Sequence, residues 1–324
     1  MGPTAGIDLG GTKIQAVVLD PDGELAGQGR TRTPVDGGAD AVVGAIGTAL
    51  AGAASAAGLA AGDLAAVGLG SPGQIDQASG SVIGAANLPG FEQPVPLRDL
   101  VAEATGVQRV ALDNDVNVGT LAEQRHGAGR GHDDLLAVFA GSGVGGGVVL
   151  GGRLRRGLTG AAGEIGHMVV VLGGDRCPCG RDGCMEAYAG RISIERKARQ
   201  AAAAGRRTVL LDLMRERGRS RMTSGVIAAA LEAGDELAHE LIDQAVAALA
   251  AAIASSVNLL DVDLVVLGGG LAEKLGAPFT ERVAGAMTPH LFASPPRVEV
   301  VGAALGDLGG AIGAAELARQ PLGP

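Results

Sequence analysis

Aromatic residues are almost missing from this chain of 324 residues, which contains no Trp, one Tyr and four Phe. Large rings therefore cannot fill its interior, and Ala, Val, Leu and Ile must supply the core. The hydrophobic share of 47% is ample for that purpose. Because the chain exceeds the usual size of a single core, we expect two lobes.

Basic residues are also scarce: the net charge is −9, only three lysines occur, and none of them follows a glycine. The missing Gly-Lys dipeptide excludes a P-loop, whose lysine reaches the phosphates of a nucleotide. No run of Lys and Arg is interleaved with aromatics. We expect no nucleic-acid partner, because neutralising a phosphate backbone requires a basic face.

A secretory signal is missing too, and one uncharged stretch of 22 residues, Ala41 to Gly62, is long enough to cross a bilayer. Its strongly apolar residues are few, and Val42, Val43, Ile46 and Leu50 share one helical face. That pattern predicts a helix packed on a sheet. No cluster of positive charge flanks the stretch, so we expect a soluble, cytoplasmic protein without a membrane partner.

Cysteine occurs only in one short segment, where Cys177, Cys179 and Cys184 follow His167. The alternatives are a disulfide pair with one leftover thiol, or incidental core cysteines. An odd count and the missing signal argue against a disulfide framework. Three thiols and one imidazole suit a closed tetrahedral zinc site, which we favour. The carboxylates Glu164 and Glu186 bracket this cluster.

Glycine is abundant, and it forms two loops between apolar strands about 130 residues apart. The strands Ala5–Ile7 and Ile14–Leu19 flank the first loop, and Leu135–Ala140 and Val148–Leu150 flank the second. This repetition predicts a duplicated domain. Gly141 to Gly146 satisfies a dinucleotide-binding pattern, but β-branched residues follow where that motif needs a helix, so we expect a hairpin. Its bare N–H groups suit phosphates, although a tight turn is the alternative.

Four further segments complete the sequence pattern. Leu264–Leu267 predicts a strand, and the glycines after it leave room for a flat base. Helices are expected over Glu236–Leu260 and Gly309–Arg319. The polar run Asp113-Asn114-Asp115 follows the apolar stretch Val107–Leu112 and is either a solvated turn or a site; taken alone, it favours the turn.

Together these motifs resemble the ROK family of sugar kinases and repressors. Asp8-x-Gly-Gly-Thr-Lys13, Asn114-Asp115, the Gly141–Gly147 loop and the Glu164-x-x-His167…Cys-x-Cys-Gly-x-x-Gly-Cys-x-Glu186 run occur in the family's order. The resemblance covers nearly the whole chain and is strongest to the glucokinases. It implies the α/β, two-lobed, duplicated fold of the actin, hexokinase and Hsp70 group, which is ribonuclease H-like, with a cleft between the lobes. The expected domains are a small lobe over residues 1–118, joined by the C-terminal helix at about 307–324, and a large lobe over residues 119–306 that carries the zinc loop.

The resemblance also implies a role for each motif residue. Asp115 would be the general base, acting on a hexose hydroxyl. The sugar-binding residues would be Asn87, Asn114, Asp115, Glu164, His167 and Glu186. The ATP-binding residues would be Gly6, Asp8, Gly10, Gly11, Thr12, Lys13, Gly141, Ser142, Gly143, Gly145, Gly146, Gly268, Gly269 and Gly270. Asp8 would orient Mg²⁺, and His167, Cys177, Cys179 and Cys184 would hold a structural Zn²⁺.

We therefore expect ATP-dependent phosphorylation of a hexose, glucose first, by a homodimer or higher homo-oligomer. The alternatives are a kinase for another hexose or N-acetylhexosamine (N-acetylmannosamine, N-acetylglucosamine, fructose or allose), polyphosphate as the donor, or a non-catalytic sugar-binding regulator. Family regulators carry a DNA-binding helix-turn-helix before the first loop, and here that loop begins at Gly6. Arg191 stands where many relatives have glycine, a departure next to the expected sugar site.

Overall fold

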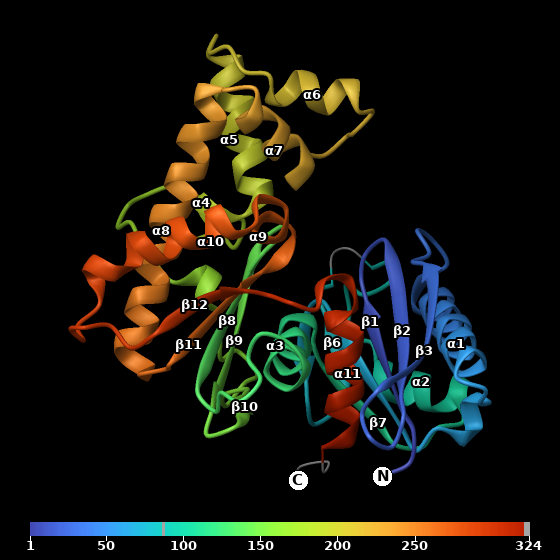
Figure 1. Ribbon diagram of the computed structural model, residues 1–324. Helices are drawn as coiled ribbons and strands as arrows, with labels where there is room; N and C mark the ends of the chain where they lie inside the picture. Colours follow the sequence, from blue (N-terminus) through green and yellow to red (C-terminus); the bar gives the residue numbers. More distant parts are fainter. Residues whose placement is uncertain (86–87, 321–324) are drawn as a thin grey trace. The chain divides into compact units, whose positions relative to one another are not determined.

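Two five-stranded sheets with the same strand order organise the computed structural model, which describes residues 1–85 and 88–320 (Figure 1). The first sheet runs β3-β2-β1-β4-β7, and the second runs β10-β9-β8-β11-β12. In each, an antiparallel hairpin supplies one half and parallel strands extend the other. The domain duplication predicted from the two glycine loops is confirmed by this shared topology.

The strands of the first sheet are β1 (Thr4–Leu9), β2 (Lys13–Leu19), β3 (Leu25–Arg32), β4 (Ala66–Ser71) and β7 (Val110–Asn114). Those of the second are β8 (Leu135–Ala140), β9 (Val144–Leu150), β10 (Arg153–Arg155), β11 (Leu264–Gly268) and β12 (Glu299–Gly302), and β5 (Gln74–Asp76) and β6 (Ser81–Ile83) form a separate small hairpin. The β8–β9 pairing, from Ala140↔Val144 outward, confirms a hairpin at the second glycine loop.

The chain divides into two compact units. Unit 1 contains Met1–Gly131, Leu154–Ala162 and the C-terminal stretch from Leu305, and unit 2 contains His132–Arg153 and Gly163–Ala304. Unit 1 extends past the boundary expected after residue 118, because the helix that follows β7 packs on the C-terminal helix. The buried Glu123 carboxylate reinforces this contact by accepting a hydrogen bond from the Leu305 N–H at 3.0 Å.

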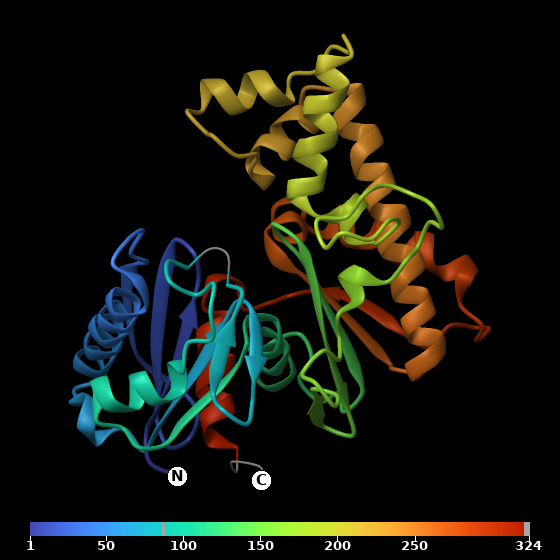
Figure 2. The ribbon, with the colours of Figure 1, turned by 180° about the vertical axis from the view of Figure 1, so that it is seen from behind.

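Helices cover both faces of the first sheet (Figure 2). They are α1 (Gly38–Ala56), α2 (Leu97–Thr105), α3 (Asp115–His126) and α11 (Gly309–Arg319), with short 3₁₀ turns η1 (Ala61–Asp63) and η4 (Gly306–Leu308). The strand residues Ile7 and Ile14 share one core with Val42 and Ile46 of α1, and Val17 of β2 packs with α11 on the other face. The helix predicted on a sheet is therefore α1.

Small residues let α11 lie unusually close to its sheet. A Cβ atom added at Gly6 would stand 2.0 Å from the Ala311 carbonyl oxygen, and one at Gly68 would stand 1.7 Å from that of Ala314. Side chains do not approach backbone this closely, so both positions require glycine. The space between α11 and the sheet is therefore closed by backbone contact, and no large aromatic side chain is needed to fill it.

Unit 2 is largely helical outside its sheet. Its elements are η2 (Ile165–His167), α4 (Glu186–Ala189), α5 (Arg191–Ala203), α6 (Leu210–Glu216), α7 (Ser224–Glu232), α8 (Glu236–Leu260), α9 (Gly269–Leu275), α10 (Ala277–Met287) and η3 (Thr288–His290). The expected helix α8 runs through the centre of the largest core cluster. Among the described residues, α1 and α8 are long and apolar enough to span a membrane by length and composition. Both bury their apolar faces inside the protein, as core helices do.

Candidate active site

The end of β7 carries the polar run, and the structure makes it a strand-to-helix junction. Asp113, 1% exposed, accepts hydrogen bonds at Oδ1 from the Asn114 N–H and the Asn117 side-chain amide, each at 2.8 Å. Its Oδ2 pairs with Arg156 Nε at 2.5 Å. A buried carboxylate with this many partners is a rigid support. The run is therefore ordered, not a solvated turn.

Asn114 and Asp115 occupy the start of α3. The Asn114 Oδ1 atom caps the helix by accepting from the Val116 N–H at 2.9 Å, and its amide donates to the Gly73 carbonyl at 3.3 Å. Asp115 is the first helical residue, and its Oδ1 also accepts from the Val116 N–H at 2.9 Å. This places its carboxylate at the positive end of the helix dipole.

Asp8 lies near the end of β1, and β1 and β7 both pair in parallel with β4. The carboxyl ends of these strands meet at one edge of the sheet, so Asp8 and Asp115 approach each other. Burial, and then the charge of Asp115, raises the pKa of Asp8 to about 6 from an ordinary 3.8. Crowded carboxylates of this kind favour the binding of a cation between them.

The first glycine loop is the tip of the β1–β2 hairpin. The Gly10 N–H bonds the Lys13 carbonyl at 3.0 Å and closes the turn, which leaves Gly11 and Thr12 exposed. Lys13 forms an ion pair with Asp307 at 2.8 Å, and the hydrogen bond from Lys13 lowers the pKa of Asp307. Gly6, by contrast, is buried under α11, so the structure gives it a packing role and not an exposed N–H for ATP.

The second glycine loop is held against the start of α5. The Arg191 and Ile192 N–H groups donate to the carbonyls of Gly141 and Ser142 at 3.1 and 3.0 Å. Ser142 itself is exposed. Gly146 lies buried within β9, where a Cβ atom would stand 2.6 Å from the Ile165 side chain, so its role is packing. The accessible part of this loop is its tip.

Glu186 links this loop to the cysteine segment. Its Oε2 atom accepts from the Val144 N–H at 2.8 Å, and its Oε1 atom lies 3.8 Å from Cys177 Sγ. A Cβ atom on Gly143 would stand 2.2 Å from that Oε2 atom, so glycine is required beside the carboxylate. One side chain thus contacts both the glycine loop and the cluster of thiols.

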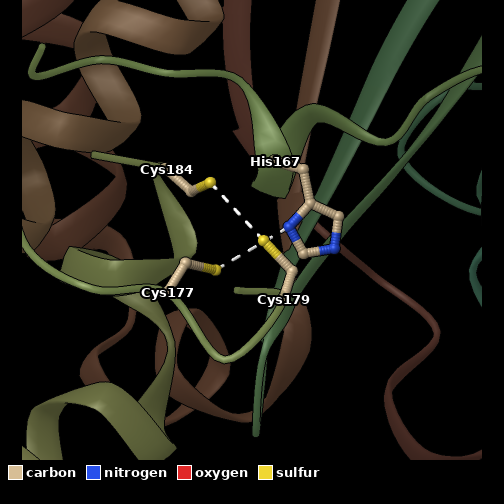
Figure 3. Close-up of side chains that lie close together, drawn as sticks. All are labelled: His167, Cys177, Cys179 and Cys184. Atoms are coloured by element: carbon tan, nitrogen blue, oxygen red, sulfur yellow. Dashed lines mark hydrogen bonds between the residues drawn. The ribbon is translucent and has the colours of Figure 1, made fainter. Parts of the chain in front are cut away.

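The three cysteines and His167 converge, as Figure 3 shows. Their four candidate ligand atoms all lie within 4.8 Å of one another. The Cys179 and Cys184 sulfurs are 3.7 Å apart, and Cys177 Sγ lies 3.9 Å from His167 Nδ1. Zinc–sulfur bonds of about 2.3 Å at tetrahedral angles would separate two sulfurs by about 3.8 Å. The donor set and its spacing therefore fit Zn²⁺.

The two ring nitrogens of His167 face different neighbours. Nδ1 points to the thiols, whereas Nε2 lies 3.8 Å from Glu164 Oε2. Burial raises the pKa of the Cys177 thiol to about 12, and a bound cation would oppose this by favouring the thiolate. The imidazole can therefore hold a metal through one nitrogen and leave the other for a polar ligand.

The sole tyrosine fastens the cysteine loop to α5. The Tyr188 hydroxyl accepts from the Asp175 N–H at 2.9 Å. Lys197 of α5 lies 4.1 Å above the Tyr188 ring and pairs with the Asp175 carboxylate at 2.6 Å. These contacts order the segment that carries the thiols.

The third glycine segment turns from β11 into α9. Gly268 is buried, with a Cβ atom there standing 2.8 Å from the Phe139 ring, and it serves packing. Gly269 has a φ of 81°, and a Cβ atom on it would stand 2.6 Å from the Ala140 carbonyl. The turn therefore lies directly against the end of β8, beside the second glycine loop.

The structure thus gathers the expected site residues in two groups, one in each unit. Unit 1 brings together Asp8, the first loop and the Asn114–Asp115 junction, and unit 2 brings together the second loop, Glu186 and the cluster of His167 with three cysteines. Asn87 lies outside the described residues. The side-chain contacts of Arg156 and Arg191 were not predictable from the sequence, because neither arginine belongs to a local motif that indicates its partner.

The chain matches known proteins along nearly its whole length. The model of the ROK family matches residues 4–321. A glucokinase from Streptomyces coelicolor is 32% identical, with 99% of each chain covered. The ROK hexokinase from Thermus thermophilus superposes with a TM-score of 0.83 at 36% identity, covering 98% of each chain. A ROK glucokinase from Streptomyces griseus, in complex with glucose and AMPPNP, gives 0.80 at 35% identity, covering 99% of this chain and 100% of that one.

Proposed function

The chain belongs to the ROK family, and we propose that it is a sugar kinase that transfers the terminal phosphoryl group of ATP to a hexose, with glucose as the preferred acceptor. The observation that carries this proposal is the Asp115 carboxylate at the start of α3, supported by the buried Asp113 network and facing Asp8. The full-length similarity to glucokinases, one of them holding glucose and AMPPNP, supports the same activity.

Phosphoryl transfer depends mainly on positioning and on neutralising the phosphate oxygens. Asp115 aligns the sugar hydroxyl and accepts its proton as the hydroxyl oxygen bonds to the γ-phosphorus and the bond from that phosphorus to the departing ADP breaks. Asp8 would hold Mg²⁺, which would neutralise charge on the donor phosphates. The exposed tips of the two glycine loops, around Thr12 and Ser142, offer N–H and hydroxyl donors to those phosphates.

Hydrogen-bonding side chains would recognise the sugar hydroxyls. We assign this role to Asn114, Glu164, His167 and Glu186, together with Asn87. Asn114 Oδ1 keeps a second lone pair after capping α3, and His167 keeps Nε2. A site that bonds each hydroxyl rejects analogues that lack one.

Zn²⁺ would be held by His167 Nδ1 and the three thiolates, and its part is structural. All four ligand positions come from the protein, so no position stays open for catalysis. His167 and the three cysteines would hold the ion, and the bound ion would fix the orientation of His167 and the segment between Glu164 and Glu186. Its contribution to the sugar site would therefore be structural.

A kinase for an N-acetylhexosamine is the second candidate. It is favoured by a 33% identical N-acetyl-D-glucosamine kinase from Salmonella paratyphi A, of which 98% is covered. We further propose a soluble cytoplasmic protein that forms homodimers or higher homo-oligomers, as we expected from the sequence.

The test is a coupled assay with ATP and a panel of hexoses and N-acetylhexosamines. Glucose should give the highest kcat/KM, and a higher value for an N-acetylhexosamine would favour the second candidate. Asp115→Asn should lower kcat by about a thousandfold or more, because general-base catalysis and alignment are both lost, while glucose binding persists. Near-normal turnover would remove Asp115 from the role of base.

A further inference from the structure

Arg191, the first residue of α5, places its guanidinium group beside the second glycine loop. Nη2 donates to Ser142 Oγ at 2.8 Å, and Nη1 donates to Ser224 Oγ, at the start of α7, at 3.4 Å. The Arg191 N–H also bonds the Gly141 carbonyl at 3.1 Å. Backbone and side chain together fix this arginine at the tip of the loop.

The half-buried guanidinium group has no carboxylate at ion-pair distance among residues 1–85 and 88–320. Arg199, which also lies on α5, does have such a partner, because it forms an ion pair with Glu195 at 2.8 Å. Burial, and then the charge of Arg221, lowers the pKa of Arg191 against a smaller opposing effect of Glu195. A cation in these surroundings gains stability when an anion binds beside it.

The position of this cation lies between two glycine segments. Gly269 abuts the backbone of Ala140 at the end of β8, and a Cβ atom on Gly270 would stand 3.8 Å from Arg191 Nη1. Figure 1 shows the starts of α5 and α9 beside the tip of the β8–β9 hairpin. A phosphate chain running from one glycine segment to the other would pass the guanidinium group.

We propose that Arg191 binds the phosphate chain of the donor nucleotide and so determines donor affinity. This inference rests on the proposed kinase function. Two serine hydroxyls occupy only part of the five-donor guanidinium fork, so donors are left for phosphate oxygens. Arg191 stands where many relatives have glycine, and the sequence suggested an effect on the neighbouring sugar site. The proposal assigns the effect of this residue to binding of the phosphate donor instead.

The test is calorimetric titration of the zinc-loaded protein with Mg²⁺-AMPPNP, with inorganic tripolyphosphate, and separately with glucose. The variants are Arg191→Gln, which removes the charge, and Arg191→Lys, which keeps the charge without the fork. Arg207→Gln is the matched control, because it removes the same charge from an exposed position on the loop after α5. Melting temperature and zinc content show whether each variant is folded.

Arg191→Gln should weaken AMPPNP and tripolyphosphate binding by about ten- to a hundredfold, in the range expected for a charge-assisted hydrogen bond. Glucose affinity should stay within about twofold, Arg191→Lys should recover part of the loss, and Arg207→Gln should match the wild type. Unchanged AMPPNP affinity, or a loss confined to glucose, would overturn the proposal. If the wild type binds AMPPNP but phosphorylates no sugar, the kinase function fails while the Arg191 proposal is still decided by these affinities.

Discussion

Replacing Asp8 by Asn should make the protein more stable while it removes the proposed Mg²⁺ site. Folding raises the pKa of this carboxyl from 3.8 to about 6, chiefly through burial. The native state therefore binds the proton more tightly than the unfolded state does. The stabilisation is complete below pH 3.8 and is lost as the pH rises through about 6. Above that range, wild-type Asp8 carries a buried charge that the amide avoids.

The size of the effect follows from the shift. A pKa rise from 3.8 to about 6 corresponds to about 3 kcal/mol in the free energy of unfolding. About half of that is already lost by pH 5, so the advantage of Asp8→Asn should grow by about 1.5 kcal/mol between pH 5 and pH 8. The amide and the protonated carboxyl can also differ in hydrogen bonding, but this difference changes the free energy of unfolding by an amount that does not vary with pH.

Urea unfolding of the Mg²⁺-free protein, followed by far-ultraviolet circular dichroism because Trp is missing, measures this difference. Asp307→Asn is a control of opposite sign, since the hydrogen bond from Lys13 lowers the pKa of Asp307. That variant should lose stability at neutral pH, and its deficit should shrink in acid. An advantage of Asp8→Asn that is the same at pH 5 and pH 8 would refute the reasoning.

Three further outcomes are expected. Gly143→Ala should displace Glu186 from the Val144 N–H and lower the free energy of unfolding by about 1–3 kcal/mol. Gly141→Ala should be tolerated, because the atom nearest to its added Cβ would stand 4.0 Å away. Equal melting temperatures of the two variants would contradict this. Cys179→Ser should lower both zinc content and glucose affinity, and zinc loss at unchanged affinity would show that the ion does not shape the sugar site. Tyr188→Phe should speed zinc release to a chelator by about fivefold, as loss of one hydrogen bond of about 1 kcal/mol implies, and an unchanged rate would mean that Asp175 is held by Lys197 alone.

Local pattern was enough to predict much of the fold. The bounds of α8 and α11 and of strand β8 agree with the sequence expectation, because apolar periodicity within one segment determines them. The β8–β9 hairpin was also predictable, since β-branched Val148 and Val149 disfavour a helix after the loop. The convergence of His167 with the three cysteines was also predictable, because these four side chains are close in sequence and are the types that zinc prefers.

Contacts between distant segments were not predictable from one sequence. The sequence predicts that Gly6 belongs to a phosphate loop. Glycine is needed there for another reason, because the backbone of α11, some three hundred residues further along the chain, leaves no room for a Cβ atom. The boundary expected after residue 118 falls within α3, whereas packing on α11 keeps the whole of α3 in unit 1. Arg156 reaches Asp113 from another strand end, and no spacing rule connects them.

The close packing of α11 connects two features of the protein. It fills the core without aromatic residues, and it helps to position the carboxylates of Asp8 and Asp115. Close approach of this helix at Gly6 and Gly68 brings its first turn onto Asp8, where a Cβ atom on Gly310 would stand 2.7 Å from the Asp8 Cγ atom. The same helix contacts α3 at Gly313, where an added Cβ atom would stand 1.7 Å from the Val118 carbonyl oxygen. Helix α3 begins with Asp115. A larger residue at any of these glycines would push one carboxylate away from the other. The small residues that build the core without rings therefore also set the distance between the proposed base and the proposed Mg²⁺ ligand.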